Sequence, residues 1–131
     1  MNPSAQIAQY KRNAVLSATP TQLLIMLYDR LVLDLKRAES AQLEGAWESA
    51  SGQLLHAQDI IAELQSSLNV DVWDGGADLL ALYTYVNTAL ISANVNRNVA
   101  LTREALAHIE PLHQTWREAA VLDTAGARRV S

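Results

Sequence analysis

The sequence predicts an all-α protein, an antiparallel up-down-up-down four-helix bundle with a short N-terminal cap segment. Ala, Leu, Gln, Glu and Arg, which favour helices, are abundant, whereas β-branched and aromatic runs are missing. Apolar residues recur at spacings of three and four along most of the chain. The breaks between these stretches are short, so consecutive helices are expected to run antiparallel.

The N-terminal part of the chain divides into a cap segment at residues 1–18 and a first helix at residues 20–42. The cap segment has too few apolar residues to form a stable helix alone, so we expect it to lie against the bundle. Thr19 and Gln22 have the spacing of a capping box, and Pro20 suits the first helical position. These residues predict a sharp helix start.

The first helix is expected to bury a wide surface and to pair charges on its exposed side. Its regular apolar stripe is widened by three further side chains, Leu23, Met26 and Leu33. The charge pairing expected on the exposed side involves Arg30, Asp34 and Arg37, which have helical ion-pair spacing.

Three more helices follow, after turns at Gly45, at residues 75–76 and at residues 94–98. The second helix has the most regular three-four alternation, made by Trp47, Ala50, Leu54, Ala57, Ile61, Leu64 and Leu68. The third is predicted at 77–94, and Asn98 is expected to cap the fourth. Pro111 lies inside the fourth helix and should kink or break it. Each helix is expected to have about twenty residues, with the bundle at 19–122 and a flexible tail at 123–131.

The third predicted helix has an unusual composition. Residues 79–96 contain no charged side chain. A helix on the outside of a globular protein normally has one apolar stripe and one charged face. A helix without the charged face is usually covered on more than one side. We therefore expect the functional surface to lie on this helix rather than in a catalytic pocket.

Composition and charge exclude several classes of function. The net charge of −4 argues against binding to nucleic acid or to anionic membranes. There is no cysteine, which excludes disulfides and thiolate sites and fits a reducing compartment. No secretion signal is visible at the N-terminus. Membrane insertion is not expected either, because the uncharged stretch contains Thr84, Asn87, Thr88, Ser92, Asn94 and Asn96.

The sequence gives little support to catalysis, and we predict no catalytic residue, no metal ligand and no cofactor. Di-metal centres in helical bundles need Glu-x-x-His on two helices and a further Glu on the two others. The chain has one such pair, Glu110 and His113, and a weaker spacing in His56 and Asp59. The third helix has no carboxylate after Asp78. A metal-binding four-helix enzyme therefore remains only an alternative.

Two tyrosines of the third helix cannot share one environment. Tyr83 and Tyr85 point about 200° apart on a helix, so both cannot face the core. One of them must be exposed or covered by something external. Amphipathic tyrosines beside aliphatic residues suit a groove that accepts a peptide, although a well-filled core with a polar rim would give the same pattern.

Five blocks of residues occur in order along the chain. They are Tyr10; Ala18-Thr19-Pro20 followed by Leu23-Leu24-Ile25-Met26-Leu27-Tyr28-Asp29; Ala57-Gln58-Asp59-Ile60-Ile61-Ala62-Glu63-Leu64; Leu82-Tyr83-Thr84-Tyr85-Val86-Asn87 with Ala93-Asn94; and Trp116. In order and spacing these blocks resemble the flagellar secretion chaperones of the FliS family, which escort flagellin. The family fold is an antiparallel four-helix bundle, in agreement with the periodicity.

The resemblance implies a cytoplasmic, non-enzymatic export chaperone. Such chaperones bind the C-terminal segment of flagellin, prevent its premature polymerisation and present the subunit to the type III export apparatus. The flagellin segment is then the expected partner, and the flagellar export gate a further one. Amphipathic client helices would lie in hydrophobic grooves on the bundle.

The predicted partner-binding surface lies on the second and third helices. Its residues are Leu54, Gln58, Ile61, Tyr83, Tyr85, Asn87, Ile91 and Asn94. In the free protein, Ile7 and Tyr10 of the cap segment are expected to cover part of the groove until the client displaces them. A self-associating helical module, in which the uncharged helix packs against its own copy, is the remaining alternative.

Overall fold

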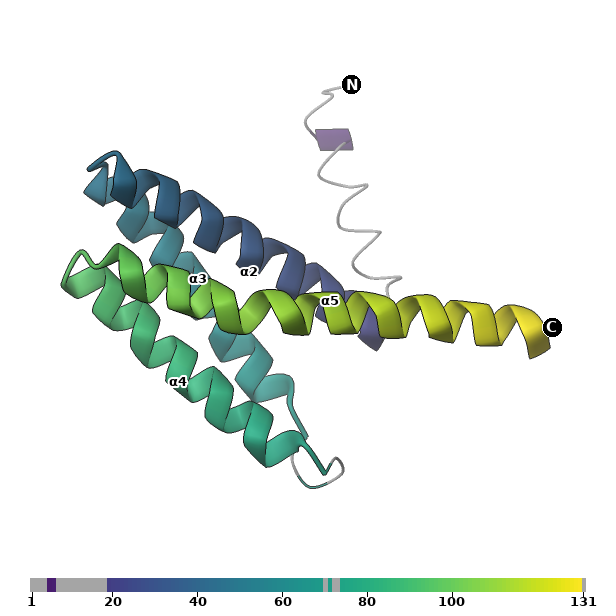
Figure 1. Cartoon of the computed structure of the whole chain (residues 1–131). Coiled ribbons are helices and arrows are strands. Elements are labelled where there is room, and N and C mark those ends of the chain that lie inside the picture. The colour runs from purple at the N-terminus through teal and green to yellow at the C-terminus, as the bar shows by residue number, and fades with distance from the viewer. Residues whose placement is uncertain (1–4, 7–18, 70, 72–73, 131) are drawn as a thin grey trace.

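The computed structural model describes residues 5–6, 19–69, 71 and 74–130, with the backbone alone at 123–130. Within these residues the chain forms four long helices, α2 (Pro20–Leu43), α3 (Trp47–Ser67), α4 (Gly76–Val95) and α5 (Val99–Val130). Consecutive helices run antiparallel, and α5 returns beside α2 to close the ring (Figure 1). The predicted all-α four-helix bundle is confirmed.

The predicted helix start and turns are present. The Thr19 hydroxyl accepts from the Gln22 backbone N–H at 3.1 Å, and the Gln22 side chain accepts from the Thr19 N–H at 2.9 Å. Gly45, which ends the first helical stretch, has a φ of +74°, a conformation that favours glycine. The Asn98 side chain accepts from the Ala100 N–H at 3.0 Å and so caps α5.

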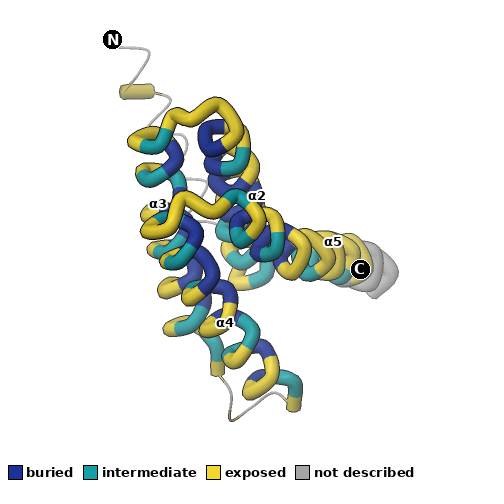
Figure 2. The backbone as a smooth tube through the Cα atoms, turned by 60° about the vertical axis from the view of Figure 1, so that its left-hand side comes forward, coloured by how far each residue is buried: buried dark blue, intermediate teal, exposed yellow. Residues whose placement is uncertain are grey.

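The core runs along the axis of the bundle, where each helix turns its apolar stripe inward. Figure 2 shows these buried segments on the inner faces of the helices. Large side chains with less than 2% exposure come from every helix, and they include Leu35 of α2, Leu54 and Ile61 of α3, Leu90 of α4 and Ile109 of α5. The three-four spacing read from the sequence thus identified the core stripe.

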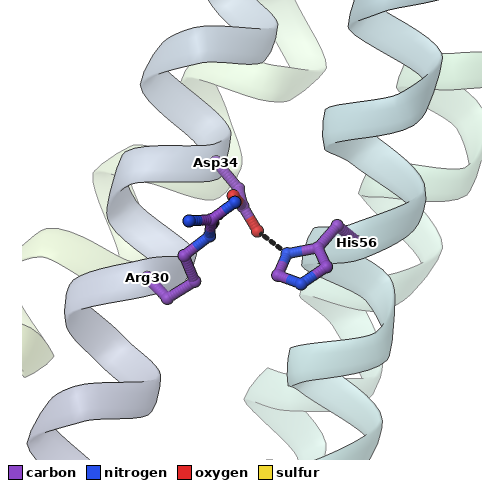
Figure 3. Close-up of polar contacts among 3 residues, drawn as sticks. All are labelled: Arg30, Asp34 and His56. Atoms are coloured by element: carbon purple, nitrogen blue, oxygen red, sulfur yellow. Dashed lines mark hydrogen bonds and ion pairs between the residues drawn. The ribbon is translucent and has the colours of Figure 1, made fainter. Parts of the chain in front are cut away.

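Asp34 does not lie on the exposed side of α2, where the sequence placed it. Its side chain is fully buried between α2 and α3 (Figure 3). Arg30 Nε donates to one carboxylate oxygen at 2.9 Å, and His56 Nδ1 bonds the other. Burial is possible because both oxygens have a partner, as a buried carboxylate requires.

The wide burial expected for α2 is wrong. Leu23, Met26 and Leu33 keep 37%, 39% and 38% of their surface exposed. A helix at a corner of a four-helix ring has only two neighbours, so additional apolar positions remain in solvent.

Helix α5 is longer than expected and continues through Pro111. It has 32 residues and extends past the other helices (Figure 1). The expected break is absent, because the exposed proline lets solvent bond the carbonyl that its missing N–H leaves free. The helix also runs to Val130 and includes most of the expected tail. The domain division at residue 122 remains a prediction.

Candidate functional site

The seam between α3 and α4 is lined by uncharged side chains. One side chain from each helix meets across it, because Gln65 Nε2 donates to Thr84 Oγ1 at 3.2 Å. Residues three or four positions apart lie on the same face of a helix, so counting from Gln65 and Thr84 gives one row of seam residues on α3 and one on α4. The α3–α4 seam, as we define it, comprises Ser51, Leu55, Gln58, Ala62 and Gln65 from α3, with Leu80, Thr84, Asn87, Ile91 and Asn94 from α4.

The seam is accessible over its length, and one of its hydroxyl groups, that of Thr84, is bonded within its own helix. All ten seam residues are half-buried or exposed. Thr84 Oγ1 also donates to the backbone carbonyl of Leu80 at 3.0 Å, which satisfies this hydroxyl within its own helix. A partner that covers this seam would remove apolar side chains from water without burying a charge.

The remaining seams between neighbouring helices carry charges. Across α2 and α5, Asp29 pairs with His113, Lys36 with Glu110 at 4.0 Å, and Glu39 with Arg103 at 3.6 Å. Asp34 and His56 join α2 to α3. Tyr85 of α4 donates to Glu104 of α5. Within the described residues, no ion pair crosses from α3 to α4, and none of the ten seam residues is charged, whereas a charged side chain takes part in the contacts named at every other seam.

An apolar cavity of about 540 Å³ opens at the end of the bundle where α2 begins and α3 ends. Its walls come from all four helices, mainly from leucines, and the lining residues are Pro20, Leu23, Leu24, Leu27, Glu63, Leu64, Ser67, Leu68, Asn69, Leu79, Tyr83 and Trp116. A volume of this size suits one or two large side chains of a partner. The charged and amide lining residues both come from α3 and the turn that follows it.

Aromatic residues form the floor of this cavity. The hydroxyl oxygens of Tyr83 and Tyr28 lie 2.5 Å apart. Trp116 packs edge-on against the Tyr28 ring, and His113 stacks on it, each with a centroid distance of 6.4 Å. Burial raises the pKa of both tyrosines, most strongly that of Tyr83, so both stay neutral at ordinary pH. The tyrosines of this cluster are therefore uncharged.

The structure places the predicted site residues in different environments. Leu54, Ile61 and Tyr83 lie in the core, where they support the surface but do not form it; Tyr83 is 1% exposed. Gln58, Asn87, Ile91 and Asn94 lie together along the α3–α4 seam. Tyr85 is 50% exposed but faces α5, where its ring meets His108. Ile7 and Tyr10 lie outside the described residues.

The tyrosine expectation is confirmed, since one of the two rings is buried and the other exposed. Sequence reasoning missed the other half of the seam, especially Leu55 of α3, which is exposed. A helical wheel of α3 with Gln58 on its outer face would have found it. The end cavity was missed because it forms between helix ends that are distant in sequence.

The residue pairs considered for metal binding do not converge. His113 bonds Asp29, while Glu110 lies near Lys36. His56 turns to the buried carboxylate of Asp34. Across the part of the chain that the structure describes, no three acidic, histidine or cysteine side chains come together as a metal site would need. In the same residues, no helix is both long and apolar enough to cross a membrane.

Comparison with known proteins gives the family directly. The family model described as flagellar protein FliS matches residues 3–123, which is nearly the whole chain. The chain belongs to the FliS family.

Named relatives and a solved structure agree with this family. The flagellar secretion chaperone FliS of Bacillus subtilis (strain 168) is 29% identical over 110 residues, which are 84% of this chain and 82% of the relative. The protein of that name from Escherichia coli (strain K12) is 31% identical over 108 residues, 81% of this chain and 79% of the relative. A crystal structure described as a flagellar chaperone from bacteria matches with a TM-score of 0.71 at 22% identity, covering 90% of this chain and 98% of the other. That likeness supports the bundle fold of this family member.

Proposed function

We propose that this member of the FliS family is a cytoplasmic flagellar secretion chaperone whose client is the C-terminal segment of flagellin. Binding keeps this segment from polymerising before export and helps to deliver the subunit to the type III export apparatus, where the export gate is a further partner. The chain acts by binding and not by catalysis. The chaperone names of its relatives support this role.

The α3–α4 seam is the observation that carries the proposal. Its two rows of aliphatic and amide side chains run along the two helices and carry no charge. An amphipathic client helix presents apolar residues at spacings of three and four, which match such rows. Leu55 and Ile91 are the large apolar side chains that a client helix would cover, and both are exposed in the free bundle.

The cavity at the end of the bundle gives the client a second anchor point. It lies beside Tyr83, which belongs to the same helix as half of the seam. A client segment that follows the seam and ends in the cavity would bury a long surface. Such a surface offsets the conformational entropy that a disordered segment loses when it folds on binding.

The N-terminal segment acts as a cover in this proposal. It joins α2 at Thr19, next to Pro20, which lines the cavity. Ile7 and Tyr10 supply apolar side chains for the covered surface. A tethered cover competes at high effective concentration, so it weakens the apparent affinity for the client while it shields apolar surface.

Calorimetric titration of the full chain with the flagellin C-terminal segment of the same organism tests the function. Saturable one-to-one binding with a large negative heat-capacity change is expected, because the client folds against apolar surface. No binding at high micromolar concentration, with the bundle folded, would overturn the assignment. The cover is tested by deleting residues 1–18. Unchanged client affinity together with unchanged solubility would show that no cover exists.

A further inference from the structure

Lys and Arg are missing from the sequences of α3 and α4. Residues 38–96, which include all of α3 and α4, contain no Lys or Arg. The same stretch contains eight acidic residues, Glu39, Glu44, Glu48, Asp59, Glu63, Asp71, Asp74 and Asp78. The half of the molecule that carries the proposed client surface is therefore uncharged along its seam and acidic around it, except at the end where Arg97 lies over the Trp47 ring.

Glu63 is the acidic residue that lines the cavity. It lies in the last two turns of α3, and the last turn of that helix has no basic residue. A helix C-terminus carries partial negative charge on its free carbonyls, which favours a cation nearby. Among the described residues, none bonds or pairs with the Glu63 carboxylate. Two sources of negative potential thus meet at the mouth of an apolar cavity without a described cation of the bundle paired to them.

The chemistry of a matching occupant follows from this arrangement. The leucine walls and the Tyr83 and Trp116 floor accept a large aliphatic side chain. The carboxylate at the mouth accepts a Lys or Arg about one turn along the same helix, where i,i+3 and i,i+4 positions are neighbours. An acidic residue at that position would be repelled, which is how charged rims reject wrong partners.

We propose that Glu63 is a specificity-determining residue, which selects a client helix with a large aliphatic anchor and a basic residue one turn away. This inference rests on the proposed function, because it assigns a chemistry to the segment that the bundle binds. The anchor fills the cavity, and the basic side chain pairs with the Glu63 carboxylate and with the C-terminal end of α3.

The test compares the affinity of the flagellin C-terminal segment for the full chain and for two variants. Glu63→Gln keeps the shape of the side chain and removes its charge, so binding should weaken by about twofold to fivefold, the range of a partly exposed ion pair. Glu63→Lys should weaken it further, by about tenfold, because it places like charges together. Replacing the Lys and Arg residues of the segment with Gln should abolish the difference in affinity between the unchanged chain and the Glu63→Gln variant.

A matched control separates a local pairing from the effect of net charge. Glu44→Gln removes one charge at the end of α2, which is not part of the seam or the cavity lining, and should leave the affinity unchanged. Equal losses in the Glu44 and Glu63 variants, or no loss at Glu63, would overturn the specificity proposal while client binding stands. Failure of the unchanged chain to bind would instead overturn the proposed function. Tighter client binding by Glu63→Gln would assign the cavity to the chain's own N-terminal segment, which carries Lys11 and Arg12, and would also overturn the proposal.

Discussion

The hydroxyl oxygens of Tyr28 and Tyr83 lie 2.5 Å apart in the core and join α2 to α4. These two helices stand at opposite corners of the bundle, since α3 and α5 are the neighbours of both. Tyr83 also lines the end cavity. The hydrogen bond therefore links two diagonally opposite helices and also positions Tyr83 in the floor of the cavity.

Removing either hydroxyl should destabilise the bundle. Tyr28→Phe leaves the Tyr83 hydroxyl buried without this partner, which should lower the free energy of unfolding by about 1–3 kcal/mol. The double change to Phe should cost less than the sum of the two single changes, because it removes both polar groups together. Urea unfolding of the three variants measures this. Additive losses would mean that the two hydroxyls are not coupled.

The contributions of Arg30 and His56 to the free energy of unfolding should depend on each other, because both side chains bond Asp34. Either partner can be replaced by Ala at a cost of about 1 kcal/mol, because both are half exposed and the remaining one still bonds the carboxylate. Replacing both leaves a buried carboxylate alone, which should cost about 3–5 kcal/mol. Chemical denaturation of the two single variants and the double variant measures the coupling, and a double cost of about 2 kcal/mol would refute it.

Sequence periodicity predicted the helices because burial on one face is a local property of each helix. The capping box at Thr19 and the asparagine cap at Asn98 were predicted for the same reason, since each involves neighbours in the chain. The buried Asp34 was not, because its second partner, His56, comes from another helix. The spacing of charged residues along α2 predicts an exposed Arg30–Asp34 pair, and it does not indicate that His56 is a second partner of Asp34.

The hydrogen bonds that cross the core were also not predicted from the sequence. Gln42 was predicted only as the end of the first helix, yet it is 4% exposed. It donates to the Ala93 carbonyl at 3.2 Å and accepts from the Thr102 hydroxyl at 2.7 Å. These partners lie more than fifty residues away. The seam was half predicted, because the missing charge of α4 is local, whereas the row from α3 depends on how the helices pack.

Tyr85 should titrate at higher pH than an ordinary tyrosine. Its hydrogen bond to Glu104 and the charge of that carboxylate raise its pKa from the usual 10.0. A pKa that is higher in the folded state favours folding at lower pH, and this contribution is lost as pH rises through the folded value. The buried Tyr28 and Tyr83 also titrate late, so the Tyr85 step in an alkaline titration followed by tyrosinate absorbance is the one that should move toward 10.0 in Glu104→Gln. No movement would mean that the pair does not form.

Ile91 should be required for client binding but not for folding. Its side chain is 45% exposed on the α3–α4 seam, so Ile91→Asp should cost little stability. In the complex, however, an aspartate would replace apolar contact that is worth about 1.5–3 kcal/mol and would bury a charge. The affinity for the flagellin segment should therefore fall by at least about tenfold.

Leu33→Asp is the matched control, because Leu33 is 38% exposed on α2, away from the seam. Calorimetric titration of both variants, with their helicity checked by circular dichroism, measures the difference. If Leu33→Asp weakened binding as much as Ile91→Asp, the client would have to be placed on α2, and the uncharged surface of α4 would need another explanation.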